Sequence, residues 1–219
     1  MVWITACHNP SMADSSRRAR PVALAIFLVI AGVLGLLAAF ALSVEKVLSL
    51  ADAGHVPSCN VGVLVGCSVN LDSAQGEVFG FPNPFIGLMA WPAVIFVGVA
   101  VLAGARFPRW FWVVFNLGVA GALVFVVWLI VQSIYVLYVL CPWCMLTWAV
   151  TIPTFWAVTL HNLRAGNIPS SARVQRVAAA WFKWIPLITV VCYGIVVALA
   201  QVHMNAIPLV MIDLQNLSR

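Results

Sequence analysis

The chain has 219 residues, of which 64% are hydrophobic and only 8% are charged, and its mean hydropathy is +1.07. Soluble domains are nearer half apolar and a quarter charged, so this composition excludes an ordinary soluble domain and indicates a polytopic membrane protein. The formal net charge of +5 does not mark a nucleic-acid-binding protein, because the basic residues stand in short clusters between apolar runs.

Five apolar segments are long enough to cross a bilayer. We predict spans at residues 22–43, 84–105, 110–139, 141–161 and 184–203. The first span is longer than the core of a signal peptide and more spans follow it, so we interpret it as a retained anchor. Two hydrophilic connections are expected: an outer loop over 44–83 and a basic cytoplasmic loop over 162–183.

The distribution of basic residues predicts the orientation. If the N-terminal tail, residues 1–20, is cytoplasmic, the only basic residues outside are Lys46 and Arg219. The basic residues inside are then Arg17, Arg18, Arg20, Arg106, Arg109, Arg164, Arg173, Arg176 and Lys183. By the positive-inside rule we expect a multi-pass protein of the inner (plasma) membrane, with the 44–83 loop on the periplasmic or extracytoplasmic face.

A C-P-W-C motif opens the fourth predicted span. Cys141 and Cys144 are three residues apart, a spacing that suits a disulfide on the first turn of a helix. Pro142 favours the first helical position, because it has no N–H to lose there. A helix N-terminus stabilises the thiolate, which is the reactive form of cysteine. The motif therefore favours redox chemistry over a pair of inert buried cysteines.

A second cysteine pair, Cys59 and Cys67, lies in the outer loop. On a continuous helix their Cα atoms would be separated by about 12 Å of rise, too far for a disulfide. Either the segment bends, which Gly62 and Gly66 permit, or one of the two reaches across to the C-x-x-C pair by thiol–disulfide exchange.

Two dithiols on one membrane face can form an electron relay. A soluble protein can meet the loop pair, and the helix pair can meet a lipid-soluble acceptor of two electrons, a description that a quinone fits. Two other interpretations were weighed. A zinc site of four cysteines is unusual beside lipid outside the cytosol. Two structural disulfides in a transporter or other non-enzymatic scaffold would leave the pairs without redox chemistry. Cys192, inside an apolar run, is interpreted as a small buried hydrophobe.

Four features resemble the vitamin K epoxide reductase family, specifically its bacterial members, over roughly residues 20–160. They are Cys59-x7-Cys67 followed by Ser68, the run from Gly76 to Gly87 (GEVFGFPNPFIG), Cys141-x-x-Cys144 at the start of a span, and the order of the two pairs. The resemblance implies an all-α integral membrane protein with a four-helix transmembrane bundle around a quinone and a fifth transmembrane helix. The catalytic domain would be 21–161, and 184–219 would be the fifth helix with a short outer tail.

The resemblance also implies roles for individual residues. Cys144 would face the quinone, and Cys141 would exchange with Cys67. Cys59 would take electrons from a soluble partner. Asn83 would donate a hydrogen bond to a quinone carbonyl, which stabilises the negative charge that develops there. No metal is expected.

Two departures from the family pattern stand out. Trp148 occupies a position where family members often carry a tyrosine, and its indole N–H can donate a hydrogen bond but cannot pass on a proton as a phenol can. Many bacterial members continue into a thioredoxin-like domain, whereas this sequence ends at Arg219. We therefore expect a separate periplasmic thioredoxin-fold partner of the DsbA type.

The sequence thus predicts a disulfide-generating enzyme, a thiol:quinone oxidoreductase that uses menaquinone or ubiquinone. The alternative enzyme is a quinone or vitamin K epoxide reductase whose main product is the quinol. The four-span DsbB type carries its C-x-x-C in the first outer loop, and the order of the pairs here argues against it.

Overall fold

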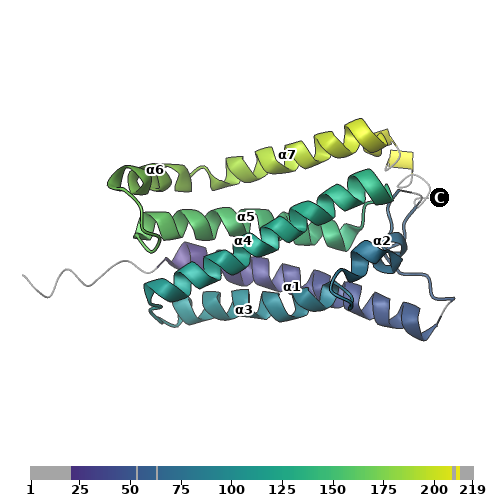
Figure 1. The fold of residues 1–219 in the computed structure, drawn as a ribbon, viewed down its shortest axis with the longest axis horizontal. Coiled ribbons are helices and arrows are strands. Elements are labelled where there is room, and N and C mark those ends of the chain that lie inside the picture. Colours follow the sequence, from purple (N-terminus) through teal and green to yellow (C-terminus); the bar gives the residue numbers. More distant parts are fainter. Residues whose placement is uncertain (1–20, 53, 63, 209–210, 213–219) are drawn as a thin grey trace, which may run out of the picture.

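The structure, a computed structural model, describes residues 21–52, 54–62, 64–208 and 211–212 (Figure 1). The predicted tail 1–20 and residues 213–219 lie outside this part of the chain. Helices are α1 (Val22–Ala51), α2 (Ser68–Asp72), α3 (Pro84–Leu102), α4 (Arg109–Gln132), α5 (Pro142–Ala165), α6 (Ala172–Phe182) and α7 (Ile185–Met204), with a 3₁₀ turn η2 (Ala74–Glu77) and a π-helical turn η3 (Ser133–Leu137).

Four long helices, α1, α3, α4 and α5, form the bundle, and α7 lies along the outside of α5 (Figure 1). The closest packing is between α1 and α3. Small residues on α1 allow it: a Cβ at Gly32 would lie 2.6 Å from Ile95 Cγ1, and one at Gly35 would overlap the Trp91 indole. Small residues of this kind let two membrane helices approach closely.

The five predicted spans are confirmed as helices. Within the described residues, five helices are long and apolar enough to cross a membrane. The helix that contains the first predicted span continues beyond residue 43, to Ala51. Glu45 and Lys46 read as the start of a polar loop, but both side chains are buried against polar partners and remain helical.

The region predicted as a basic loop, 162–183, contains a helix. Ser171 accepts a hydrogen bond from the N–H of Val174 and caps α6, as serine does at many helix starts. Val177, Ala178 and Trp181 then give α6 an apolar face at helical spacing. The sequence analysis did not predict this helix, because the basic residues on the other face of α6 dominated the composition.

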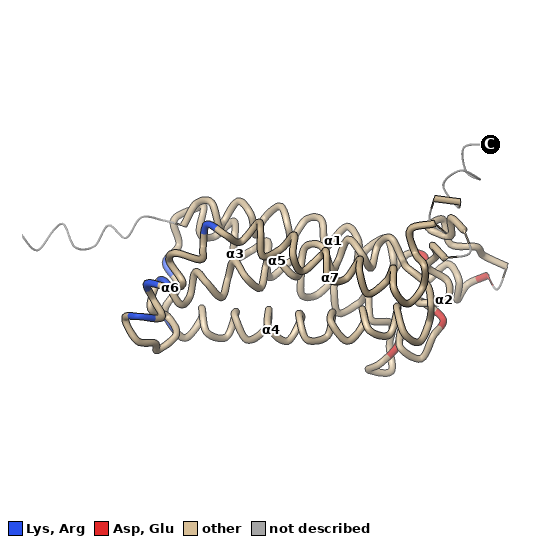
Figure 2. Tube along the Cα trace, turned by 90° about the horizontal axis from the view of Figure 1, so that it is seen from above, with Lys and Arg blue, Asp and Glu red and all other residues tan. Residues whose placement is uncertain are grey.

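The two ends of the bundle differ in charge (Figure 2). The described lysine and arginine residues gather at the end that carries α6 and the turn between α3 and α4, and the described aspartates and glutamates gather at the end that carries α2. Lys46 is the described exception, since it pairs with Asp72 and Glu77 at the acidic end.

The outer loop folds across that acidic end. After α1 the chain turns at the loop cysteines, forms α2 and η2, and returns into α3. A single parallel β-bridge joins Val65 to Leu140, the residue before the C-x-x-C motif. Tyr138 turns the chain between η3 and this bridge with a left-handed backbone, φ 54°. The bridge therefore brings the two cysteine-bearing segments together.

Candidate active site

The loop cysteines form a disulfide with each other. The sequence allowed either a bend between them or a bond from one of them to the C-x-x-C pair, and the structure contains the bend. The Cα atoms of Cys59 and Cys67 are 5.7 Å apart. The bend is held by backbone bonds, because the N–H groups of Val61 and Gly62 both donate to the carbonyl of Val65, at 2.9 and 3.1 Å. The disulfide therefore closes a compact turn rather than a stretch of helix.

Asn60 organises this turn, a role that the sequence analysis missed. Its Oδ1 accepts hydrogen bonds from the N–H groups of Cys67, at 2.7 Å, and Ser68, at 3.2 Å, and its Nδ2 donates to the Ser68 hydroxyl. These two N–H groups belong to the free first turn of α2. Asparagine directly after a cysteine was the available signal, since its side chain commonly bonds nearby backbone in turns.

The sulfur of Cys67 lies 3.3 Å from the sulfur of Cys141, and both residues are fully buried. The neighbouring backbone fixes this contact. The N–H of Leu140 donates to Leu64 at 2.9 Å, and the N–H of Gly66 donates to Leu140 at 3.1 Å. The loop disulfide thus contacts the C-x-x-C pair through Cys67 while it is still intact.

Cys141 is the N-cap of α5, and its sulfur accepts a hydrogen bond from the N–H of Cys144 at 3.4 Å. The pKa of the Cys141 thiol is lowered, above all by a hydrogen bond with the Cys144 side chain. Burial opposes this shift, and the N–H groups of Cys144 and Trp143 reinforce it. Cys141 is thus the thiol of the C-x-x-C pair that ionises more readily, as its position at the start of a helix predicts.

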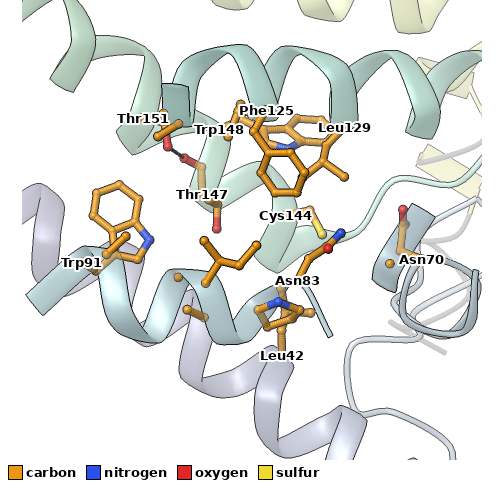
Figure 3. A pocket seen from close by; sticks show the side chains of 18 of the residues that line it. Leu42, Asn70, Asn83, Trp91, Phe125, Leu129, Cys144, Thr147, Trp148 and Thr151 are labelled. Carbon is orange, nitrogen blue, oxygen red and sulfur yellow. Dashed lines mark hydrogen bonds between the residues drawn. The ribbon is translucent and has the colours of Figure 1, made fainter. Parts of the chain in front are cut away.

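A cavity of about 350 Å³ lies between α1, α3, α4 and α5, beneath the segment that contains α2 and η2 (Figure 3). Its walls are almost entirely apolar, and it is large enough for a drug-sized ring system. Among its lining residues are Leu42 of α1, Trp91 of α3, Phe125 of α4, and Cys144 and Trp148 of α5. Cys144 is the one cysteine of the two pairs that lines it.

Asn83 also lines the cavity, as Cys144 does, and its side chain is drawn among the lining residues in Figure 3. Its Nδ2 donates to the carbonyl of Gln75 at 2.6 Å, and its Oδ1 accepts from the N–H of Val78 at 3.2 Å. An amide nitrogen has two N–H groups, so a second donor is left for a molecule in the cavity. The loop thus holds Asn83 at the cavity wall.

Trp148 is buried and forms part of the wall near Phe125 (Figure 3). Thr147, one residue earlier, lines the same cavity and was not singled out from the sequence. Its hydroxyl donates to the carbonyl of Trp143 at 3.1 Å, an ordinary i−4 bond within the helix. The indole, this hydroxyl and the hydroxyls of Thr151 and Thr154 are the polar side-chain groups that α5 adds to the cavity wall.

The sequence model of the vitamin K epoxide reductase family matches residues 26–159. The chain belongs to the vitamin K epoxide reductase family. The match includes all four paired cysteines, Asn83 and Trp148, and it leaves α6 and α7 outside. Searches of curated proteins and of solved structures gave no significant match.

Membership in this family assigns the chain to membrane thiol–disulfide oxidoreductases that work with a quinone. The geometry agrees with this class, because two cysteine pairs touch beside an apolar cavity. The zinc interpretation loses two of its four thiolate ligands to the Cys59–Cys67 disulfide. Among the described residues, no group of three or more His, Cys, Asp or Glu has the arrangement of a metal site.

Proposed function

We propose that this protein generates disulfides: it reoxidises a periplasmic thioredoxin-fold partner of the DsbA type and delivers the two electrons to a membrane quinone. The observation that carries the proposal is the contact between Cys67 and Cys141, at 3.3 Å, next to a cavity lined by Cys144. The Cys59–Cys67 disulfide is thus connected to the apolar cavity through the sulfur of Cys141 and then that of Cys144.

The exchange between the two pairs balances as two thiol–disulfide steps. The thiolate of Cys67 attacks Cys141 of an oxidised helix pair, which forms a Cys67–Cys141 bond and releases Cys144 as a thiolate. The thiolate of Cys59 then attacks Cys67 and releases Cys141. The products are a Cys59–Cys67 disulfide and reduced Cys141 and Cys144, the pairing that the structure contains.

The loop disulfide then oxidises the partner. A partner thiolate attacks Cys59, Cys67 leaves, and the partner's second thiol resolves the mixed disulfide, so that two electrons and two protons pass to the loop pair. Cys59 is 6% exposed and Cys67 is fully buried, which favours attack at Cys59. The exposed Val56 stands close to Cys59 in the chain and gives the partner an apolar contact there.

The cavity residues suit a quinone headgroup. A quinone supplies the acceptor for the two electrons and two protons that Cys141 and Cys144 lose when they form a disulfide. The apolar walls exclude water, Asn83 offers a hydrogen-bond donor, and Cys144 is the sulfur in contact with the cavity. We assign Asn83 as a hydrogen-bond donor to a quinone carbonyl. Trp148 forms part of the wall and is a second N–H donor, but its indole cannot pass on a proton as a phenol can. Menaquinone and ubiquinone both have the carbonyl groups that this arrangement addresses.

The charge asymmetry of the bundle supports an orientation with the α6 end in the cytoplasm (Figure 2). Basic residues are retained on the cytoplasmic side of membrane proteins. The loop disulfide would then face the periplasmic or extracytoplasmic compartment, where disulfides persist. A soluble thiol oxidoreductase in that compartment can reach it.

A complementation experiment tests this function. The chain is expressed in a host that lacks its own enzyme for reoxidising its DsbA-type protein, and disulfide formation in secreted proteins is measured. We expect rescue by the wild type and by Cys192→Ser, a matched control on α7, and none by Cys141→Ala or Cys144→Ala. Rescue by either active-site variant would refute the proposal. Turnover of a quinone epoxide by the purified protein without any effect on secreted disulfides would favour the epoxide reductase instead.

A further inference from the structure

The last two turns of α1 carry a face that points at the redox loop. Leu42, Glu45 and Lys46 are spaced so that they lie on one side of the helix. Leu42 packs in one buried cluster with Cys59, Cys67 and Cys141. Glu45 and Lys46 are also buried, at 8% and 5% exposure, which is rare for charged residues.

Lys46 binds the segment that follows Cys67. Its ammonium donates to the carbonyl of Leu71 at 2.7 Å and lies 3.2 Å from Asp72 Oδ1 and 3.1 Å from Glu77 Oε1. An ammonium has three donors, and these three acceptors satisfy all of them. Leu71 also lines the cavity, so Lys46 holds the C-terminal end of α2 against the bundle.

Glu45 binds the segment that precedes Cys59. Its Oε1 accepts hydrogen bonds from the N–H of Ser58, at 3.1 Å, and from the Ser58 hydroxyl. Its Oε2 pairs with His55 Nε2 at 2.8 Å. The residue directly before the loop disulfide is thus tied to α1 through both its backbone and its side chain.

We propose that Glu45 and Lys46 are positioning residues of the relay. Glu45 holds the entrance of the redox loop and Lys46 holds its exit, so that the Cys59–Cys67 disulfide stays pressed against Cys141. This inference rests on the proposed function, and it adds a requirement for residues that touch neither a reacting sulfur nor the quinone cavity. Burying two charges is costly, and a hydrophobic pair would cover α1 without that cost, so their contacts with the loop account for their presence.

The test uses trapping of the exchange intermediate. In a Cys144→Ser background the Cys67–Cys141 disulfide cannot be resolved by the helix pair, and its fraction is measured by alkylation and peptide mass mapping. With Lys46 present we expect it to accumulate. Adding Lys46→Met should lower the trapped fraction about tenfold, because it removes the three contacts of the buried ammonium with the loop, and a tenfold change corresponds to about 1.4 kcal/mol. Lys46→Arg, which keeps the charge and donors, should restore most of it.

Milder and matched variants keep the test interpretable if Lys46→Met folds poorly. Asp72→Asn and Glu77→Gln each weaken one acceptor on a partly exposed side chain and should lower trapping by a smaller factor. Glu45→Gln should lower it from the other end of the loop. Lys183→Met removes a lysine that follows α6 at the opposite end of the bundle and should leave trapping unchanged.

The outcomes separate the two proposals. No Cys67–Cys141 disulfide with Lys46 and Glu45 intact would refute the relay itself, and the positioning role with it. Normal trapping in Lys46→Met and Glu45→Gln would refute only the positioning role. Equal losses in Lys183→Met and Lys46→Met would also refute it, because the effect would then be general destabilisation.

Discussion

Cys141 combines two properties at a single residue: it caps a helix, and its sulfur touches that of Cys67, with which we propose that it exchanges. The C-P-W-C spacing predicted the first property. The second depends on a residue 74 positions earlier in the chain, and no local pattern specifies such a contact. The pairing with Cys67 came instead from the family resemblance, and the sulfur–sulfur distance agrees with it.

The lowered pKa of Cys141 predicts the pH dependence of the exchange. In the reverse of the proposed exchange, Cys141 attacks Cys67 of the loop disulfide as a thiolate, so the rate of this reverse step rises with pH and levels off once Cys141 is ionised. A lowered pKa moves that plateau to a pH below about 8.5, the ordinary pKa of a cysteine thiol. Single-turnover reduction of the loop disulfide by the helix pair, quenched with acid and mapped by alkylation, measures it. A plateau at or above the ordinary thiol pKa would contradict the lowered pKa of Cys141.

Asn83 provides a second test at the scale of one residue. Asn83→Ala removes the proposed donor to the quinone carbonyl, and loss of one such donor typically lowers kcat by about a hundredfold. Stopped-flow oxidation of the reduced protein by a water-soluble quinone measures this step. Thr151→Ser, a cavity-lining control whose hydroxyl can keep its bond to the backbone, should change the rate little. Equal rates for Asn83→Ala and the wild type would remove Asn83 from the quinone site.

At the scale of helices, the long apolar segments were predictable because length and hydropathy alone define a span. The end of α1 was not predictable in this way. Glu45 and Lys46 look like loop residues until their partners Ser58, Leu71 and Asp72 are known, and those partners come from the folded loop. The same holds for Asn60, whose role is visible only once the disulfide turn exists.

The α1–α3 contact gives a prediction for helix packing. Gly35→Ala should destabilise the protein by about 1–3 kcal/mol, because the added Cβ overlaps the Trp91 indole in a packed interface. Gly121→Ala is the matched control on α4, where nothing lies within 4 Å of the new Cβ. There the better helix propensity of alanine should leave stability unchanged or raise it by up to about 1 kcal/mol. Thermal unfolding in one detergent compares the two, and equal stabilities would contradict the close approach of α1 and α3.

For the molecule as a whole, the opposite charges of its two ends lead to a prediction of topology (Figure 2). A single reporter cysteine at Ser171, the N-cap of α6, should react with a membrane-impermeant maleimide only after the cells are permeabilised. A reporter at Asp52, at the end of α1, should react in intact cells. Labelling follows the side of the membrane on which each residue lies, so the reverse pattern would place the redox loop in the cytoplasm.

The bridge between Val65 and Leu140 holds one sulfur of the loop disulfide, Cys67, by contacts that do not involve the other sulfur, Cys59. We therefore expect Cys67 to stay beside Cys141 when the disulfide opens. Cys59 would then carry the bound partner from a segment that Glu45 still holds through Ser58. In the proposed relay, the partner protein binds at Cys59 and the quinone binds in the cavity beside Cys144, so the two do not compete for one space. We therefore expect that either can bind while the other is present, in either order.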